Sequence, residues 1–144
     1  MDSKKTILVL GTFDIFHQGH YYFLSCIHTL IKNNSSDNYK LIVGLYSSAM
    51  SFNKNGYFPI KSYIERKEVL SNIEYISDIV YIDSPIPLYI KELEPTIIAL
   101  GFSQGYIKDY LKNYYEDISI IDIPSYNTDI YVTCELRNKY IRQK

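Results

Sequence analysis

The chain has 144 residues, of which 47% are hydrophobic and 22% are charged, and its formal net charge is −1. These values predict one folded domain over residues 1–144 and exclude a disordered chain. Because its 15 Lys and Arg residues are scattered, we do not expect nucleic acid as the main partner. The apolar stretch after the polar N-terminus is about five residues long, too short for a signal peptide or a membrane span, so we expect a cytoplasmic protein without membrane contact.

Short apolar runs alternate with segments in which apolar residues recur every three or four positions. The runs predict strands, and the recurring patterns predict helices. Between them, residues 47–59 are predicted to form a polar loop. The predicted strands are 6–10, 41–45, 79–82, 96–100 and 118–123, and the predicted helices are about 18–32, 62–72, 87–93, 104–114 and 133–141.

The second predicted helix has the clearest start signal. Ser62 followed by Glu65 is typical of a capping box. The buried stripe of this helix is predicted to consist of Ile64, Val69, Leu70 and Ile73.

This alternation predicts an α/β fold, a Rossmann-like three-layer sandwich with a five-stranded parallel sheet and helices on both faces. In such a sheet, ligands bind at the carboxyl ends of the strands, where the strand order reverses. We therefore expect Gly11, the segment after Leu45, and Gly101 to lie along the functional edge.

Residues 11–20, GTFDIFHQGH, carry the most specific pattern in the chain. Gly11 lets the backbone turn sharply off the first strand, and Gly19 lets a phosphate approach the backbone. The start of the following helix offers unpaired N–H groups that favour an anion. His17 and His20 are three residues apart, so at a helix start they can point to one side as paired donors.

This segment resembles the GxFDxxHxGH signature of the nucleotidyltransferase superfamily that includes the cytidylyltransferases. The resemblance implies that a nucleoside triphosphate binds along the segment, with Thr12 and Phe13 among its contacts. It also implies that His17 and His20 contact the triphosphate and stabilise the transition state at the α-phosphorus. A small phosphorylated acceptor, Mg²⁺ accompanying the triphosphate and a homodimer are further expectations from the family.

The residues of this segment leave alternatives open. Asp14 could assist a Mg²⁺ site, hold a histidine through a hydrogen bond, or cap the turn. Asp14, His17 and His20 could instead form a metal site, although this would leave both glycines unexplained. A glycine turn with incidental histidines is the remaining alternative.

The resemblance extends to residues 59–66, PIKSYIER, and the loop before them. Family members place one or two lysines in this loop, where they reach the phosphates, and an arginine in the next helix. Lys54 and Lys61 are the candidates, with Lys54 favoured. Arg66 is expected to be either a phosphate ligand or the partner of Glu65 or Asp78 in an ion pair.

Residues 131–137, YVTCELR, resemble in part the ISSTxIR segment of the family. There, hydroxyls and N–H groups at a helix start bind the outer phosphates. Thr133 supplies a hydroxyl, whereas Val132 and Cys134 stand where hydroxyl residues are usual. Arg137 matches the arginine of the family. Thr133 could equally be a plain N-cap, and Cys134 would then contribute only its backbone.

Residues 98–104, IALGFSQ, look like the IALGYDQ segment of single-domain FAD synthases and less like the GDDW segment of glycerol-3-phosphate cytidylyltransferases. In the family this strand end, here with Gly101 and Gln104, lies beside the nucleotide. The sequence therefore predicts transfer of a nucleoside monophosphate from CTP or ATP to a phosphorylated acceptor, with in-line attack at the α-phosphorus and release of pyrophosphate. A nucleotide-binding module without catalysis is the alternative, motivated by Val132 and Cys134.

Overall fold

The structure is a computed structural model that describes residues 5–33, 38–101, 104, 107–108, 111 and 117–123. The predictions at Thr133, Cys134 and Arg137, and the predicted helix 133–141, lie outside these residues. Among the helices in the described residues, none is both long enough and apolar enough to cross a bilayer.

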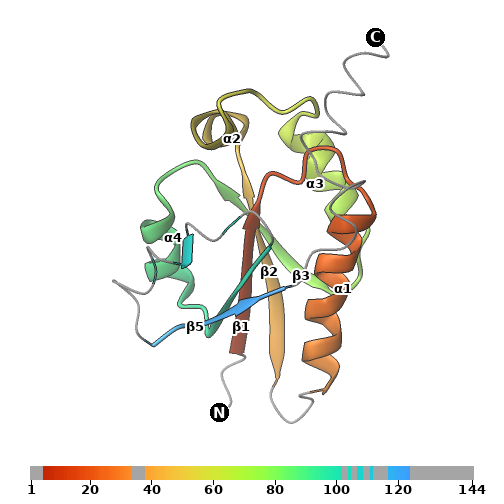
Figure 1. Ribbon diagram of the computed structural model, residues 1–144, viewed down its shortest axis with the longest axis vertical. Helices are drawn as coiled ribbons and strands as arrows, with labels where there is room; N and C mark the ends of the chain where they lie inside the picture. Colours follow the sequence, from red (N-terminus) through yellow and green to blue (C-terminus); the bar gives the residue numbers. More distant parts are fainter. Residues whose placement is uncertain are drawn as a thin grey trace.

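Along the described part of the chain, helices connect successive strands, with two helices, α2 and α3, between β2 and β3 (Figure 1). The strands are β1 (Lys5–Gly11), β2 (Tyr39–Tyr46), β3 (Ile76–Ile82), β4 (Ile97–Leu100) and β5 (Ser119–Asp122). The helices with described bounds are α1 (Gln18–Asn33), α2 (Ser48–Asn55), α3 (Tyr63–Ser71) and α4 (Ile86–Leu93).

The strands form one sheet in the order β3-β2-β1-β4-β5, and all four neighbouring pairs are parallel. The chain moves from β1 to β2 and β3 in one direction, and β4 and β5 lie on the other side of β1. The strand order therefore reverses between β1 and β4, which is where such sheets bind ligands. The predicted α/β sandwich with a five-stranded parallel sheet is confirmed.

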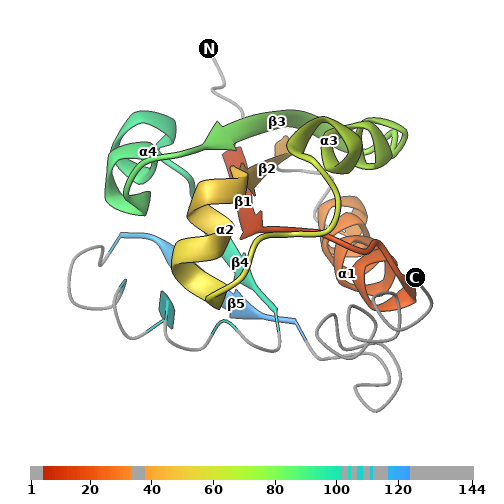
Figure 2. The ribbon, with the colours of Figure 1, turned by 90° about the horizontal axis from the view of Figure 1, so that it is seen from above.

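The alternation of side chains along β1 builds two cores. Ile7 and Val9 pack into one buried cluster with residues of α1, and Leu8 and Leu10 pack into a second cluster with residues of α4. Figure 2 shows the same layers, with α1 and α3 on one side of the sheet and α4 on the other. Gly44 in β2 is required for this packing, because a Cβ atom there would lie 2.7 Å from the Leu10 side chain.

The prediction of a loop over residues 47–59 is wrong in its first part, which forms α2. Ser47 caps this helix by accepting a hydrogen bond from the N–H of Met50, and Gly56 ends it in the left-handed conformation, with φ of 82°. The buried residue of α2 is Ser51, so no apolar period marks the helix. In Figure 2, α2 lies across the carboxyl ends of the central strands.

The predicted capping box of α3 is confirmed. The Ser62 hydroxyl accepts from the N–H of Glu65 at 3.2 Å, and the Glu65 carboxylate accepts from the N–H of Ser62 at 3.1 Å. The predicted buried stripe is wrong at two positions, because Ile64 is 69% exposed and Val69 is 42% exposed. The buried residues of α3 are Arg66 and Leu70, which lie one turn apart on the same face. A charged side chain therefore takes the inward position for which the apolar pattern had predicted Ile64 or Val69.

Candidate active site

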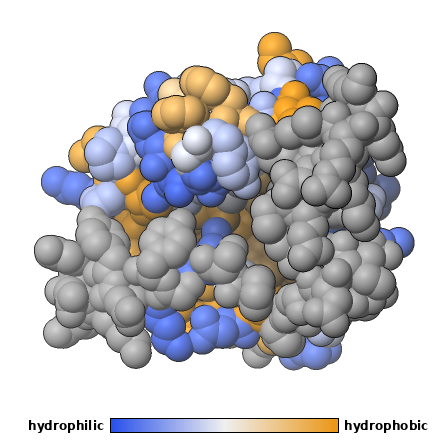
Figure 3. All heavy atoms as spheres, turned by 45° about the horizontal axis from the view of Figure 1, so that its top comes forward, coloured by the Kyte–Doolittle hydropathy of each residue, from blue (hydrophilic) through white to orange (hydrophobic). Residues whose placement is uncertain are grey.

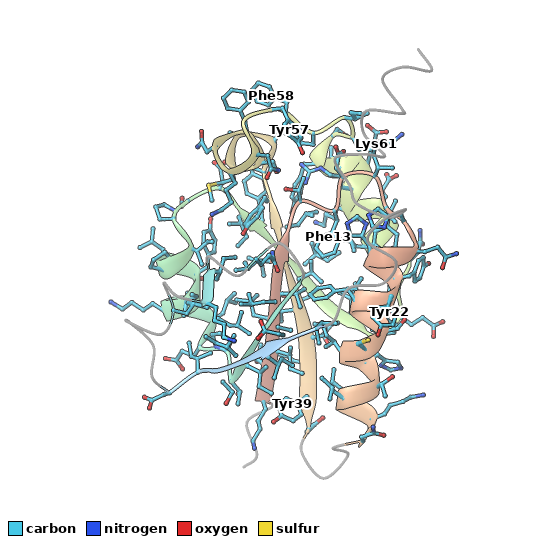
Figure 4. All side chains as sticks on the ribbon, in the orientation of Figure 1. Phe13, Tyr22, Tyr39, Tyr57, Phe58 and Lys61 are labelled. Carbon is cyan, nitrogen blue, oxygen red and sulfur yellow. The ribbon has the colours of Figure 1, made fainter. Side chains whose placement is uncertain are left out.

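The turn after β1 is built around Phe13. Its backbone is left-handed, with φ of 48°, and its ring is buried. The ring folds back over Gly11, where a Cβ atom would lie 2.9 Å from Phe13 Cε2. It also lies 5.2 Å from the ring of His20, measured between centroids, and Figure 4 shows it between β1 and α1. Gly11 is therefore needed for a close approach, and Phe13 supports the histidine instead of facing solvent.

The two histidines of the signature form a stacked pair. Their ring centroids are 3.9 Å apart, with 28° between the ring planes. The N–H of Gly19 donates to His17 Nδ1 at 3.0 Å, and the N–H of His17 donates to His20 Nδ1 at 3.2 Å. Because each Nδ1 accepts a backbone hydrogen bond, the proton of each neutral ring belongs on Nε2. Each stacked ring is therefore a hydrogen-bond donor through Nε2 at the start of α1.

Burial determines the charge of this pair in the absence of an anion. Burial lowers the pKa of His17, and burial together with the neighbouring His17 lowers the pKa of His20 to about 3. Both rings are then neutral near pH 7. A neutral ring still donates through Nε2, so the pair can bind an oxyanion without first taking up a proton.

Asp14 anchors the segment that leads into α3. It is 5% exposed, its Oδ1 accepts from the N–H of Lys61 at 2.8 Å, and its Oδ2 accepts from the N–H of Ile60 at 2.9 Å. These contacts run to backbone groups 46 and 47 residues away, and not to a histidine or to the turn that carries Asp14. Among the described residues, no group of three or more His, Cys, Asp or Glu side chains is arranged to hold a metal ion.

Arg66 is buried beneath the signature loop. Its side chain is 1% exposed. Nη1 donates to the carbonyls of Thr12 at 2.9 Å and Tyr46 at 2.8 Å, and Nε donates to the carbonyl of Lys61 at 3.2 Å. Burial lowers the pKa of the guanidinium, and the nearby Asp14 carboxylate opposes this shift.

The guanidinium of Arg66 thus donates to backbone carbonyls, and not to the carboxylates of Glu65 or Asp78. Its remaining hydrogen bond reaches the Ser48 hydroxyl at 3.4 Å. Proximity in the sequence suggested Glu65 or Asp78 as its partner. Arg66 instead lies on the buried face of α3, and its side chain reaches the ends of β1 and β2.

α2 is held over the sheet by three residues that were not expected at the site from the sequence, namely Ser47, Ser51 and Asp83. The hydroxyls of Thr12 and Ser51 are 3.0 Å apart, which joins the signature loop to the buried side of α2. The Ser47 hydroxyl donates to Asp83 Oδ1 at 2.6 Å, which joins the start of α2 to the end of β3. Ser47 as an N-cap was the available signal for this helix, but no hydrophobic period supported it.

The two candidate lysines lie on different elements. Lys54 is in the last turn of α2, exposed overall, with its Nζ 5.5 Å from the centroid of the Tyr46 ring; partial burial of the ammonium lowers its pKa. Lys61 lies on the segment between α2 and α3, at the end of the molecule where the strands end (Figure 4). Figure 3 shows apolar and polar side chains next to one another at this end.

Gln104 bridges the point where the strand order reverses. Its Oε1 accepts from the N–H of Gly101 at 2.9 Å, and its Nε2 donates to the carbonyl of Leu10 at 2.6 Å. The side-chain amide therefore joins the ends of β4 and β1. The structure brings Gly101 and Gln104 to the expected edge of the sheet, with the Gln104 amide bound to the backbone.

The parallel sheet with this strand order and the paired histidines at its switch point are consistent with the expected α/β nucleotidyltransferase. The cytidylyltransferase-like family model matches residues 8–138, and the chain belongs to this family.

Relatives over nearly the whole chain support the same class. The chain is 32% identical to an FAD synthase of Thermococcus sibiricus over 151 residues, covering 98% of this chain and 97% of that protein. It is 33% identical to an FAD synthase of Pyrococcus horikoshii, covering 85% of this chain and 82% of that protein. A lipopolysaccharide core biosynthesis protein from Thermoplasma volcanium has the same fold, with a TM-score of 0.67 at 20% identity, over 87% of this chain and 100% of that one. The chain is therefore a nucleotidyltransferase.

Proposed function

We propose that this nucleotidyltransferase adenylylates FMN, taking the nucleotide from ATP and forming FAD and pyrophosphate. The transfer chemistry is supported by one observation above all, the stacked His17 and His20 rings whose Nε2–H groups are oriented at the start of α1. The choice of ATP and FMN is supported by the similarity to FAD synthases along almost the full length of both chains.

The proposed reaction is a single in-line displacement. A phosphate oxygen of FMN forms a bond to the α-phosphorus of ATP, the bond from that phosphorus to the oxygen bridging to the β-phosphate breaks, and pyrophosphate leaves. A phosphate monoester is already ionised near pH 7, so the reaction needs no general base. The catalytic task is to align the two substrates and to neutralise the charge that develops on the phosphoryl oxygens.

The signature loop is suited to that task. The Nε2–H groups of His17 and His20 would donate to oxygens of the triphosphate, next to the backbone N–H groups at the start of α1. Gly11, Thr12, Phe13 and Gly19 would shape the phosphate-binding turn. Lys54, on α2, or Lys61, on the segment after it, would add a positive charge to the site.

The predicted residues beyond β5 complete this proposal. Thr133, Cys134 and Arg137 would bind the outer phosphates from the start of the predicted last helix. We place them in the site on the basis of the sequence motif.

Mg²⁺ enters the proposal as part of the nucleotide substrate. Both oxygens of Asp14 accept backbone N–H groups, and the described residues hold no cluster of metal-binding side chains. Mg²⁺ commonly keeps several waters and binds mainly through substrate phosphates, which fits this set of residues. Bound in that way, Mg²⁺ would neutralise part of the charge on the phosphates.

The test is a comparison of substrate pairs. Purified protein is incubated with Mg²⁺ and either ATP or CTP, together with FMN or glycerol 3-phosphate, and pyrophosphate and FAD are measured. We expect both products with ATP and FMN. Pyrophosphate release with CTP and glycerol 3-phosphate alone would replace the proposed substrates, and nucleotide binding without release under any condition would support an inactive binding module.

We also propose that the protein is a homodimer in the cytoplasm, the compartment that supplies nucleoside triphosphates. The dimer is expected from the family pattern. Light scattering would then give a mass of twice the 16.9 kDa of one chain. A mass equal to that of one chain would contradict the dimer and would leave the proposed reaction untouched.

A further inference from the structure

The backbone around Lys61 is held on both sides by buried charged groups. The consecutive N–H groups of Ile60 and Lys61 donate to the two oxygens of Asp14, at 2.9 and 2.8 Å. The carbonyl of Lys61 accepts from Arg66 Nε at 3.2 Å. Asp14 is on the loop after β1 and Arg66 is on α3, so two separate elements fix one residue of the connecting segment.

Arg66 links the same residue to the ends of two strands. Its Nη1 donates to the carbonyl of Thr12, which follows β1, and to the carbonyl of Tyr46, the last residue of β2. We call Asp14 and Arg66, with the backbone groups they bind, the clamp. Through the clamp, the position of Lys61 depends directly on the signature loop that carries the histidine pair.

The clamp goes beyond what the start of α3 requires. The capping box formed by Ser62 and Glu65 already satisfies backbone N–H groups at the beginning of this helix. Burying two charged side chains next to it is costly unless their hydrogen-bonding atoms are satisfied, and here Asp14 and Arg66 satisfy them with backbone groups. Two buried charged side chains that bind the N–H and the carbonyl of one residue are well suited to placing the side chain of that residue.

We infer that Asp14 and Arg66 are positioning residues that hold Lys61 at the active site, where its ammonium binds phosphate oxygens of the substrates. This inference rests on the proposed function, because it supposes that phosphates bind beside the signature loop. A lysine has a long flexible stem, so fixing its backbone limits the region that its ammonium can reach. Lys54 lies on α2, and none of the clamp's hydrogen bonds runs to its backbone.

The test is a double-mutant cycle of Asp14→Asn and Lys61→Met. Asn keeps the size of Asp but offers one acceptor oxygen in place of two. We expect Lys61→Met to lower kcat/KM roughly 10- to 100-fold, the range for losing a hydrogen bond to a charged group. Asp14→Asn should lower kcat/KM by a similar factor, and the double variant should be within about twofold of Lys61→Met alone, because the two act through the same contact. If the double variant loses kcat/KM by the product of the two single factors, the inference is wrong.

Two controls separate positioning from general damage. The cycle of Asp14→Asn with Lys54→Met should show effects that multiply, since Lys54 is outside the clamp. Lys67→Met, at an exposed position on α3, should leave kcat/KM close to wild type. KM values for the nucleotide and for the acceptor, measured separately, show which substrate's phosphates Lys61 binds.

If Asp14→Asn does not fold, as judged by circular dichroism, Arg66→Lys takes its place in the cycle. This variant keeps the charge but loses the forked donors of the guanidinium. If the wild-type protein releases no pyrophosphate, the proposed function fails. The cycle is then measured on the Kd for ATP, where effects that multiply would still overturn the role of the clamp.

Discussion

Replacing each signature histidine with Asn tests the paired-donor arrangement. In His20 the Nδ1 atom accepts the N–H of His17, and in His17 the Nδ1 atom accepts the N–H of Gly19. The oxygen of an Asn side chain can take over the accepting role, so the turn keeps its backbone contacts. The substitution removes the Nε2–H donor at the far side of the ring. His17→Asn and His20→Asn therefore isolate the donors from the fold of the loop.

The size of the effect follows from what is removed. The loss of one oriented donor to a developing oxyanion costs roughly 3 to 4 kcal/mol in other enzymes, or about 10²- to 10³-fold in kcat. Because the His17 and His20 rings stack at 3.9 Å, removing one ring also loosens the other. The double variant should therefore lose less than the product of the two single effects. ATP binding should weaken less than kcat, since these donors act most strongly in the transition state.

The assay is initial-rate pyrophosphate release at saturating ATP and FMN, together with calorimetric Kd values for ATP. His28→Asn is the matched control, because His28 lies further along α1 and stacks on Tyr75, which precedes β3, at 4.2 Å between centroids. It should keep a kcat close to wild type. If either signature variant keeps the wild-type kcat, the donor assignment for that histidine is refuted. If it changes only KM, the histidine acts in ground-state binding.

Three further predictions concern stability and pH. Gly11→Ala places a methyl group against the Phe13 ring and should lower the free energy of unfolding by about 1–3 kcal/mol in urea titrations; an unchanged midpoint would contradict the close approach. Ser62→Ala removes the cap that accepts from Glu65 and should cost about 0.5–2 kcal/mol in the same measurement. The pKa of His20 is lowered to about 3 in the folded state, against about 6.5 in the unfolded chain, so the unfolded state binds more protons between these values. The free energy of unfolding should therefore fall as the pH drops from about 6.5 toward 3, and less steeply in His20→Asn than in wild type.

Local patterns were enough to predict much of this protein. The TILVL run of β1, the capping box at Ser62 and the spacing of His17 and His20 each lie within a few residues of sequence. The forces behind them are local too, namely side-chain alternation, helix capping and the geometry of one helical turn. Because these forces are local, the parallel sheet, the start of α3 and the pairing of the histidines could be predicted from the sequence.

Contacts between distant residues decided the rest. Asp14 reaches backbone groups 46 and 47 residues away, Arg66 reaches Thr12 across 54 residues, and Gln104 reaches Leu10 across 94. No periodic pattern signals such contacts, because they depend on which strand ends meet when the sheet assembles. The buried place of Arg66 and the clamp around Lys61 therefore follow from the position of α3, which packs against β3 and brings the Arg66 side chain to backbone carbonyls at the ends of β1 and β2.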